Sequence, residues 1–195
     1  MLRNTLKSIA LTLLILLSLI ACASVTPAGL IAASRLDPLD SDARKIAVAL
    51  GVPDRLQLSD GDAQFQISYL SDGDSIVETV PLQVRPASAQ GPAAADPRQI
   101  VYLADFSPEN AARISSAQSR IKALKAAGVD GEGSISISVT GGCVAGDPLM
   151  ELPVTTWLRT DPDRDFVRLT RTQDMLQTLP PAQAHALTED LRLCP

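Results

Sequence analysis

The sequence predicts an α+β domain with about six mostly antiparallel strands, one long helix packed on the sheet, and short capping helices at both ends. Two observations carry this prediction. Two hairpins are indicated, at residues 63–84 and 153–171, each with an acidic turn between two strand-like segments. Between them, residues 108–127 have the spacing of an amphipathic helix. The pattern leaves open whether the strands form one sheet or a small sandwich.

The first structured element is expected to be a short helix over residues 43–50. Asp40 and Ser41 can cap its start, because their side-chain oxygens accept hydrogen bonds from free backbone N–H groups. Gly51 can supply the left-handed residue that ends a helix, and Pro53 prevents its continuation. This segment would be the N-terminal capping helix.

The first hairpin has the clearest strand pattern. The turn Asp72-Gly73 leads into a return strand over Ser75–Val84. Because Pro81 cannot donate a ladder hydrogen bond, we expect the return strand at the edge of a sheet. The first strand alternates polar residues with an apolar face formed by Ala63, Phe65, Ile67 and Tyr69.

Residues 85–98 contain several prolines, alanines and a glycine, and they are expected to form an exposed loop. A more continuous apolar strand follows over Gln99–Phe106. Ser107 then caps the long helix, and Pro108 occupies its first position. The apolar stripe of this helix has the spacing of one helical face and consists of Ile114, Ala117, Ile121 and Leu124.

Further elements complete the predicted domain. A half-buried strand is indicated over residues 135–139, where apolar residues alternate with serines. Val154–Arg159 and Phe166–Arg171 are expected to pair as the second hairpin. The tail from Pro180 to Leu193 is expected to form the second capping helix, with an inward face of Ala184, Leu187 and Leu191.

An export signal is indicated at the start of the chain. Arg3 and Lys7 precede a predominantly apolar run over Ile9–Ile20, and small residues follow. As a helix, these 12 residues would reach only about 18 Å, against a hydrocarbon core of about 30 Å. The run is therefore too short to be a good permanent membrane span.

The residues that end this signal, Leu19-Ile20-Ala21-Cys22, resemble the lipobox of bacterial lipoproteins. The resemblance implies that the Cys22 thiol carries a diacylglyceryl group, that residues 1–21 are removed, and that the new amino terminus is acylated. Because Ala23 rather than Asp follows the cysteine, it also implies the periplasmic side of the outer membrane if the organism is Gram-negative. Two alternatives stay open: ordinary cleavage near Ala21 to Ala23, or an uncleaved anchor made from residues 8–25.

The chain then divides into a signal (1–21), a lipidated tether (22–40) and a single globular domain (41–195). Loss of the signal removes two cations and changes the formal net charge from −5 to −7. An acidic surface with dispersed bases disfavours nucleic acid as a partner, and 3% aromatic residues provide few stacking platforms. The expected partners are the membrane, through the N-terminal lipid, and an envelope protein.

Two cysteines remain once Cys22 is lipidated. Cys143 and Cys194 allow a single pairing, and an exported chain favours a disulfide because many bacterial envelopes are oxidising. A reduced pair is the alternative. The bond would tie the C-terminal end to the body of the domain.

No residue constellation predicts a metal or cofactor site. Asp161, Asp163 and Asp165 have the alternate spacing of a calcium loop. However, the sixth position needs Gly and is Phe166, and the twelfth needs Glu and is Thr172. Hairpin turn chemistry explains the three acids, so we expect no bound metal and no cofactor.

No catalytic motif is recognisable either. A thiol or serine enzyme would depend on His185, the only histidine, which lies between alanines in a helical stretch. We therefore expect a non-enzymatic, lipid-anchored envelope protein with a structural, assembly or partner-binding role. The alternatives are an envelope hydrolase or redox enzyme whose site is scattered in the sequence, and a calcium-stabilised adhesion module.

Overall fold

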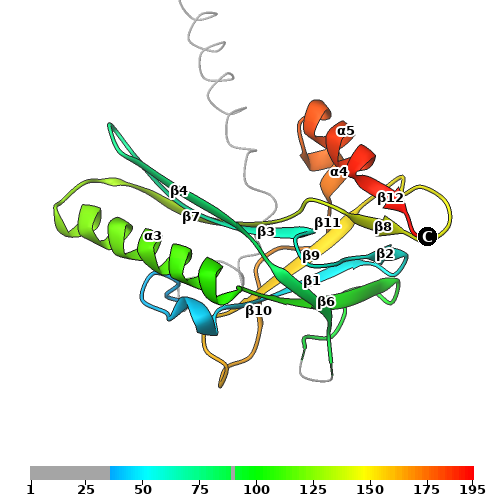
Figure 1. The fold of residues 1–195 in the computed structure, drawn as a ribbon, viewed down its shortest axis with the longest axis horizontal. Helices are drawn as coiled ribbons and strands as arrows, with labels where there is room; N and C mark the ends of the chain where they lie inside the picture. Colours follow the sequence, from blue (N-terminus) through cyan, green and yellow to red (C-terminus); the bar gives the residue numbers. More distant parts are fainter. Residues whose placement is uncertain (1–35, 89–90) are drawn as a thin grey trace, which may run out of the picture.

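The computed structural model describes residues 36–88 and 91–195. The signal, Cys22 and the tether up to residue 35 lie outside the described residues, so the structure does not test the predictions made for them. The described part is a mixed α+β fold of mostly antiparallel sheets with one long helix packed on a sheet, as the sequence predicts (Figure 1).

Within the described ranges the chain forms twelve strands, more than the six expected, because several are only two or three residues long. The strands are β1 (Ala47–Pro53), β2 (Leu56–Gln57), β3 (Ala63–Ser71), β4 (Ser75–Pro81), β5 (Gln83–Pro86), β6 (Gln99–Asp105), β7 (Gly131–Val139), β8 (Gly142–Val144), β9 (Pro153–Arg159), β10 (Val167–Arg168), β11 (Gln173–Asp174) and β12 (Leu191–Leu193). The helices are a one-turn 3-10 helix (Ala43–Lys45), α3 (Pro108–Ala126), α4 (Met175–Thr178) and α5 (Pro181–Asp190).

The strands form three sheets. The sequence left open whether there would be one sheet or a small sandwich, and a single sheet is not what the described residues form. The largest has the order β10-β9-β1-β6-β5, with β11 also pairing with β9. The second has the order β4-β3-β7, and the small third sheet has the order β12-β8-β2. Helix α3 lies along the β4-β3-β7 sheet, while α5 and β12 lie together beside β8 (Figure 1).

The helix predicted over residues 43–50 is wrong. Asp42 caps only the single 3-10 turn, and the following residues form β1, which pairs with β6 on one side and β9 on the other. All seven residues of β1 are buried, because both faces of the sheet are covered. Gly51 does not end a helix: it is a strand residue, and an added Cβ would lie 3.1 Å from the Trp157 ring.

The first hairpin is confirmed, with one change. β3 and β4 pair around the Asp72-Gly73 turn, and β4 is an edge strand, as Pro81 predicts. The return strand does not continue to Val84, because it breaks at Leu82. Residues after the break form β5, which pairs with β6 in the other sheet and extends to Pro86, into the predicted loop.

The long helix agrees with its prediction almost residue for residue. The Ser107 hydroxyl accepts a hydrogen bond from Asn110 N at 3.1 Å, and Pro108 is the first helical residue. In its apolar stripe, Ile114, Ala117 and Ile121 are fully buried. Gly128 ends the helix with φ at +78°, and Val129 N donates to Leu124 O at 3.1 Å.

The C-terminal third is more irregular than predicted. In the second hairpin only Val167–Arg168 pairs with β9 as a regular strand, through Leu158 and Trp157. The predicted terminal helix ends at Asp190, because Leu191–Leu193 forms β12 parallel to β8. Of its predicted inward face only Leu187 is fully buried. None of the helices in the described ranges has both the length and the apolar character of a membrane span.

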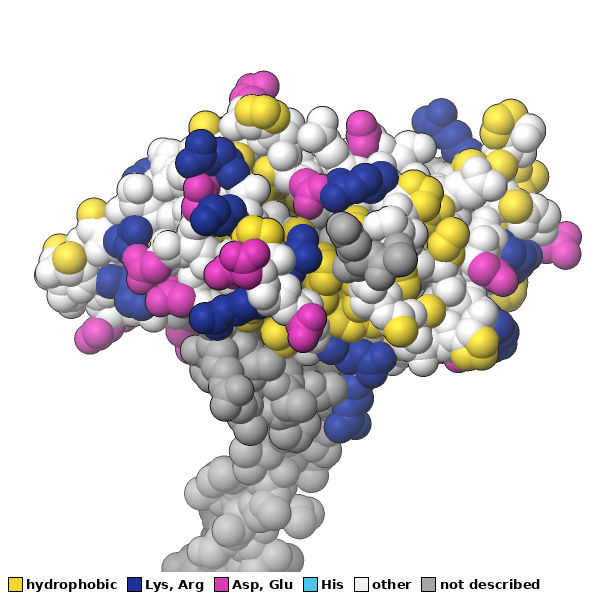
Figure 2. Space-filling model, turned by 90° about the horizontal axis from the view of Figure 1, so that it is seen from below, with side chains coloured by type: hydrophobic (Ala, Val, Ile, Leu, Met, Phe, Trp, Pro, Cys, Tyr) yellow, Lys and Arg dark blue, Asp and Glu magenta, His cyan; other side chains and the backbone are white. Residues whose placement is uncertain are grey.

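The main core lies between the two larger sheets and α3. Phe65 and Phe106 meet edge to face there, with ring centroids 5.0 Å apart. Leu36 is buried in this core, although we expected the tether to extend to residue 40. A second cluster around Trp157 covers the other face of the largest sheet. Figure 2 shows hydrophobic side chains near the centre of the face seen from below, with acidic and basic side chains interspersed around them.

Candidate functional site

A cavity of about 800 Å³ lies between the β4-β3-β7 sheet and the largest sheet. Its walls come from segments that are far apart in the sequence: residues 36–39, β3, α3, β7, β9 and residues 169–175. The volume lies in the range of about 300–1,000 Å³ that is typical of small-molecule sites. The cavity is the best candidate for a binding site in the described part of the chain.

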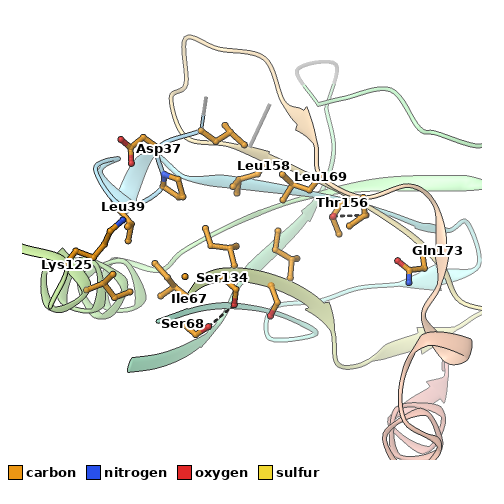
Figure 3. A pocket seen from close by; sticks show the side chains of 18 of the residues that line it. Asp37, Leu39, Ile67, Ser68, Lys125, Ser134, Thr156, Leu158, Leu169 and Gln173 are labelled. Atoms are coloured by element: carbon orange, nitrogen blue, oxygen red, sulfur yellow. Dashed lines mark hydrogen bonds between the residues drawn. The ribbon is translucent and has the colours of Figure 1, made fainter. Parts of the chain in front are cut away.

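The cavity has an apolar interior between two walls. Figure 3 shows Leu158, Leu169 and Thr156 on the side of the largest sheet, and Ile67 and Ser134 on the side of β3 and β7. Four of the hydroxyl groups in these walls bond to one another in two pairs. Ser68 Oγ lies 2.8 Å from Ser134 Oγ, and Thr156 Oγ1 lies 2.9 Å from Thr170 Oγ1. Their hydrogen-bonding groups therefore have partners in the absence of a ligand.

The free edge of β7 borders the cavity. Consecutive residues from Gly133 to Ile137 line it, although successive side chains of a strand point to opposite faces of the sheet. Both faces of this strand edge must therefore meet the cavity. Among the described strands, β7 pairs only with β3, so its other edge has no strand partner.

Charged side chains gather at one end of the cavity. Lys125 and Asp37 lie at this end together with Leu39, whereas Gln173 lies at the opposite end (Figure 3). Lys122, one turn earlier on α3, is paired with Asp40 at 3.2 Å. Lys125 has no ion-pair partner among residues 36–88 and 91–195. The cavity is thus lined mainly by apolar side chains, with hydroxyl groups in its walls and its two charged side chains at one end.

The predicted cysteine pair is present. Cys143 and Cys194 are joined by a disulfide across β8 and the end of β12, and Cys194 N donates to Val144 O at 3.0 Å. Gly142 is in the left-handed region with φ at +138°, and an added Cβ would lie 2.9 Å from Leu56 Cδ1. Cys143 is not available as a free thiol, so the bond has a structural role.

The three acids of the weak calcium candidate lie in the turn between β9 and β10. Asp161 Oδ1 accepts a hydrogen bond from Asp163 N at 3.1 Å, and the Arg164 side chain lies 4.0 Å from Asp161 Oδ2. Asp165 is exposed in the same turn. The described residues contain no cluster of three or more His, Cys, Asp or Glu side chains that could hold a metal ion.

Several other ionisable groups lie in surface turns and helices. His185 is exposed on α5, with Nε2 3.4 Å from Glu189 Oε1 one turn later. The Arg44 side chain donates hydrogen bonds to the Asp42 carboxylate and lowers the pKa of Asp42. A hydrogen bond from the backbone N–H of Arg98 likewise lowers the pKa of Asp96. None of these groups lines the large cavity.

Sequence reasoning missed the cavity entirely. The sequence held one partial signal, the alternation of Ile135 and Ile137 with serines. In the structure these two isoleucine side chains are only half-buried. A strand that alternates short hydroxyl and aliphatic side chains can border a cleft as well as a core. The sequence does not show which segments face this strand across the cavity. The opposing wall begins about 20 residues later, and no local pattern links the two segments.

Comparison of the chain with protein-family models, with curated proteins and with solved structures finds no match. The function must therefore be argued from the residues themselves, and the cavity and the N-terminal signal are the two features that carry it.

Proposed function

We propose that this protein is a lipid-anchored component of the cell envelope, on the periplasmic side of the outer membrane if the organism is Gram-negative, and that its domain has a binding role rather than an enzymatic one. The anchoring part rests on the lipobox Leu19-Ile20-Ala21-Cys22. The binding part rests on one observation, the apolar cavity between the two larger sheets.

The chemistry of the cavity supports binding over catalysis. Four of its hydroxyl groups are paired with one another at 2.8 and 2.9 Å, and an activated nucleophile would instead need a base within the same reach. The only histidine of the chain is exposed on α5 and does not line the cavity. Aliphatic walls with polar groups at one end are typical of sites that hold an apolar ligand.

The anchor is tested by metabolic labelling with a fatty-acid precursor. We expect the wild-type protein to incorporate the label and the Cys22→Ser variant to lose it completely, because the serine hydroxyl cannot form the thioether. Ser24→Ala is the matched control and should keep full labelling, since it changes a neighbouring side chain and leaves the thiol. A labelled Cys22→Ser variant, or an unlabelled wild type, would contradict the proposed anchor.

A further inference from the structure

We infer that the cavity binds one acyl chain of a membrane phospholipid, with the lipid phosphate placed at Lys125. This inference rests on the proposed function and names the ligand class of the same cavity. Three features carry it: the apolar interior, the charged groups at one end, and the place where the chain from the membrane anchor reaches the domain.

The interior matches a hydrocarbon chain. Aliphatic side chains line both walls, including Ile67 from β3, Ile135 from β7 and Leu158 from β9. Four of the wall hydroxyls bond to each other, across β3–β7 and between Thr156 and Thr170, so these four do not need a ligand. Each methylene group transferred from water to such walls adds to the affinity, so a long chain is a strong ligand.

The charged end matches a zwitterionic head group. Lys125 can contact a phosphate, because no acid pairs with it in the described part, whereas the neighbouring Lys122 is already paired with Asp40. Asp37 is at the same end of the cavity and can face the amine of the head group (Figure 3). All other side chains that line the cavity are uncharged, which gives the ligand one orientation.

The position of this end also suits a ligand that comes from the membrane. Residues 36–39 form part of the wall, and Leu36 is only 14 residues after Cys22. A chain of that length reaches at most about 50 Å. A lipid-anchored protein therefore keeps the charged end of its cavity within about that distance of the bilayer.

Calorimetric titration of the mature chain with lysophosphatidylethanolamine, below its micelle concentration, tests the inference. Residues 22–195 with Cys22→Ser can be made without the signal and oxidised, so the titration does not depend on the anchor. We expect saturable binding of one ligand. Ile135→Asp should weaken it by about tenfold or more, because it places a charge in the apolar wall. Val77→Asp, a 52% exposed position of β4 in the same sheet that does not line the cavity, is the matched control and should bind like the wild type.

Charge reversal on α3 tests the head-group assignment with variants that keep the core intact. Lys125→Glu should weaken binding of the lysophospholipid by about tenfold, the effect of losing one charged contact. It should leave binding of a neutral monoacylglycerol unchanged. Arg120→Glu, an exposed cation on the same helix that does not line the cavity, should change neither.

Three results would overturn the inference. The first is no saturable binding by the folded wild-type chain, and the second is equal binding by the Ile135→Asp and Val77→Asp variants. The third is that an extended apolar peptide binds while no lipid does, and that Ile135→Asp abolishes binding of the peptide. That result would assign the cavity to strand addition along the free edge of β7, and the proposed binding role would stand. Failure of the Cys22 labelling would instead overturn the anchor and the argument from its reach, and it would leave the measured lipid binding unchanged.

Discussion

Removal of the Cys143–Cys194 disulfide should lower the free energy of unfolding by about 4 kcal/mol. The bond closes a segment with a sequence separation of 51, and the loss of loop-closure entropy from the unfolded chain gives this value in the chain-entropy model. The effect should be measured by urea denaturation of the Cys143→Ser, Cys194→Ser double variant in the Cys22→Ser background. The loss of stability should appear mainly as a lower urea concentration at the midpoint of unfolding.

The reduced protein provides the control for this prediction. Reductant should shift the midpoint of the disulfide-containing protein to that of the double variant, and it should leave the double variant unchanged. The bond holds β12 parallel to β8, and few other groups secure this end of the chain, since Leu193 is 63% exposed. A difference below about 1 kcal/mol would show that strand pairing alone fixes the C-terminal end.

Truncation of Phe65 should destabilise the domain to a similar extent. Phe65 is 1% exposed on β3 and packs edge to face on Phe106. Phe→Ala substitutions at such sites cost about 3–5 kcal/mol, because they remove buried surface and leave a cavity. The Phe65→Ala variant should therefore lose about 4 kcal/mol in the same denaturation experiment.

Phe166→Ala is the matched control for this change. Phe166 is half-buried beside the second cluster, with the Arg159 guanidinium 4.6 Å from its ring centroid. Its truncation should cost about 1 kcal/mol, the order of an exposed cation–π contact. Equal losses in the two phenylalanine variants would mean that the core is not centred between β3 and α3.

The elements that the sequence predicts correctly are those with local signals. The Ser107-Pro108 start and the three- and four-residue spacing fix α3, and the Asp72-Gly73 turn with its flanking alternation fixes the first hairpin. Each of these signals acts over a few residues. The disulfide could be predicted because two cysteines allow only one pairing.

β1 was missed because its apolar run has no period. Residues 46–52 are buried on both sides, and such a run has the same pattern in a buried helix and in a central strand. The strand depends on distant partners, β6 and β9, and on the Trp157 ring that packs against Gly51. None of these partners is visible within the segment itself.

The cavity could not be predicted for a similar reason. Lys125 has the pattern of any solvent-facing lysine in the last turn of a helix, and Thr156 that of any strand threonine. Only the packing of two sheets places these residues around one space. Local patterns specify secondary structure, whereas the site arises from the way the sheets meet.

The intact mass of the mature protein, extracted from membranes with detergent, tests the central claim most directly. The account predicts a chain that begins at Cys22, carries a diacylglyceryl group and one further acyl chain, and lacks residues 1–21. A chain that retains residues 1–21, or an unmodified chain that begins near Ala21 to Ala23, would contradict it.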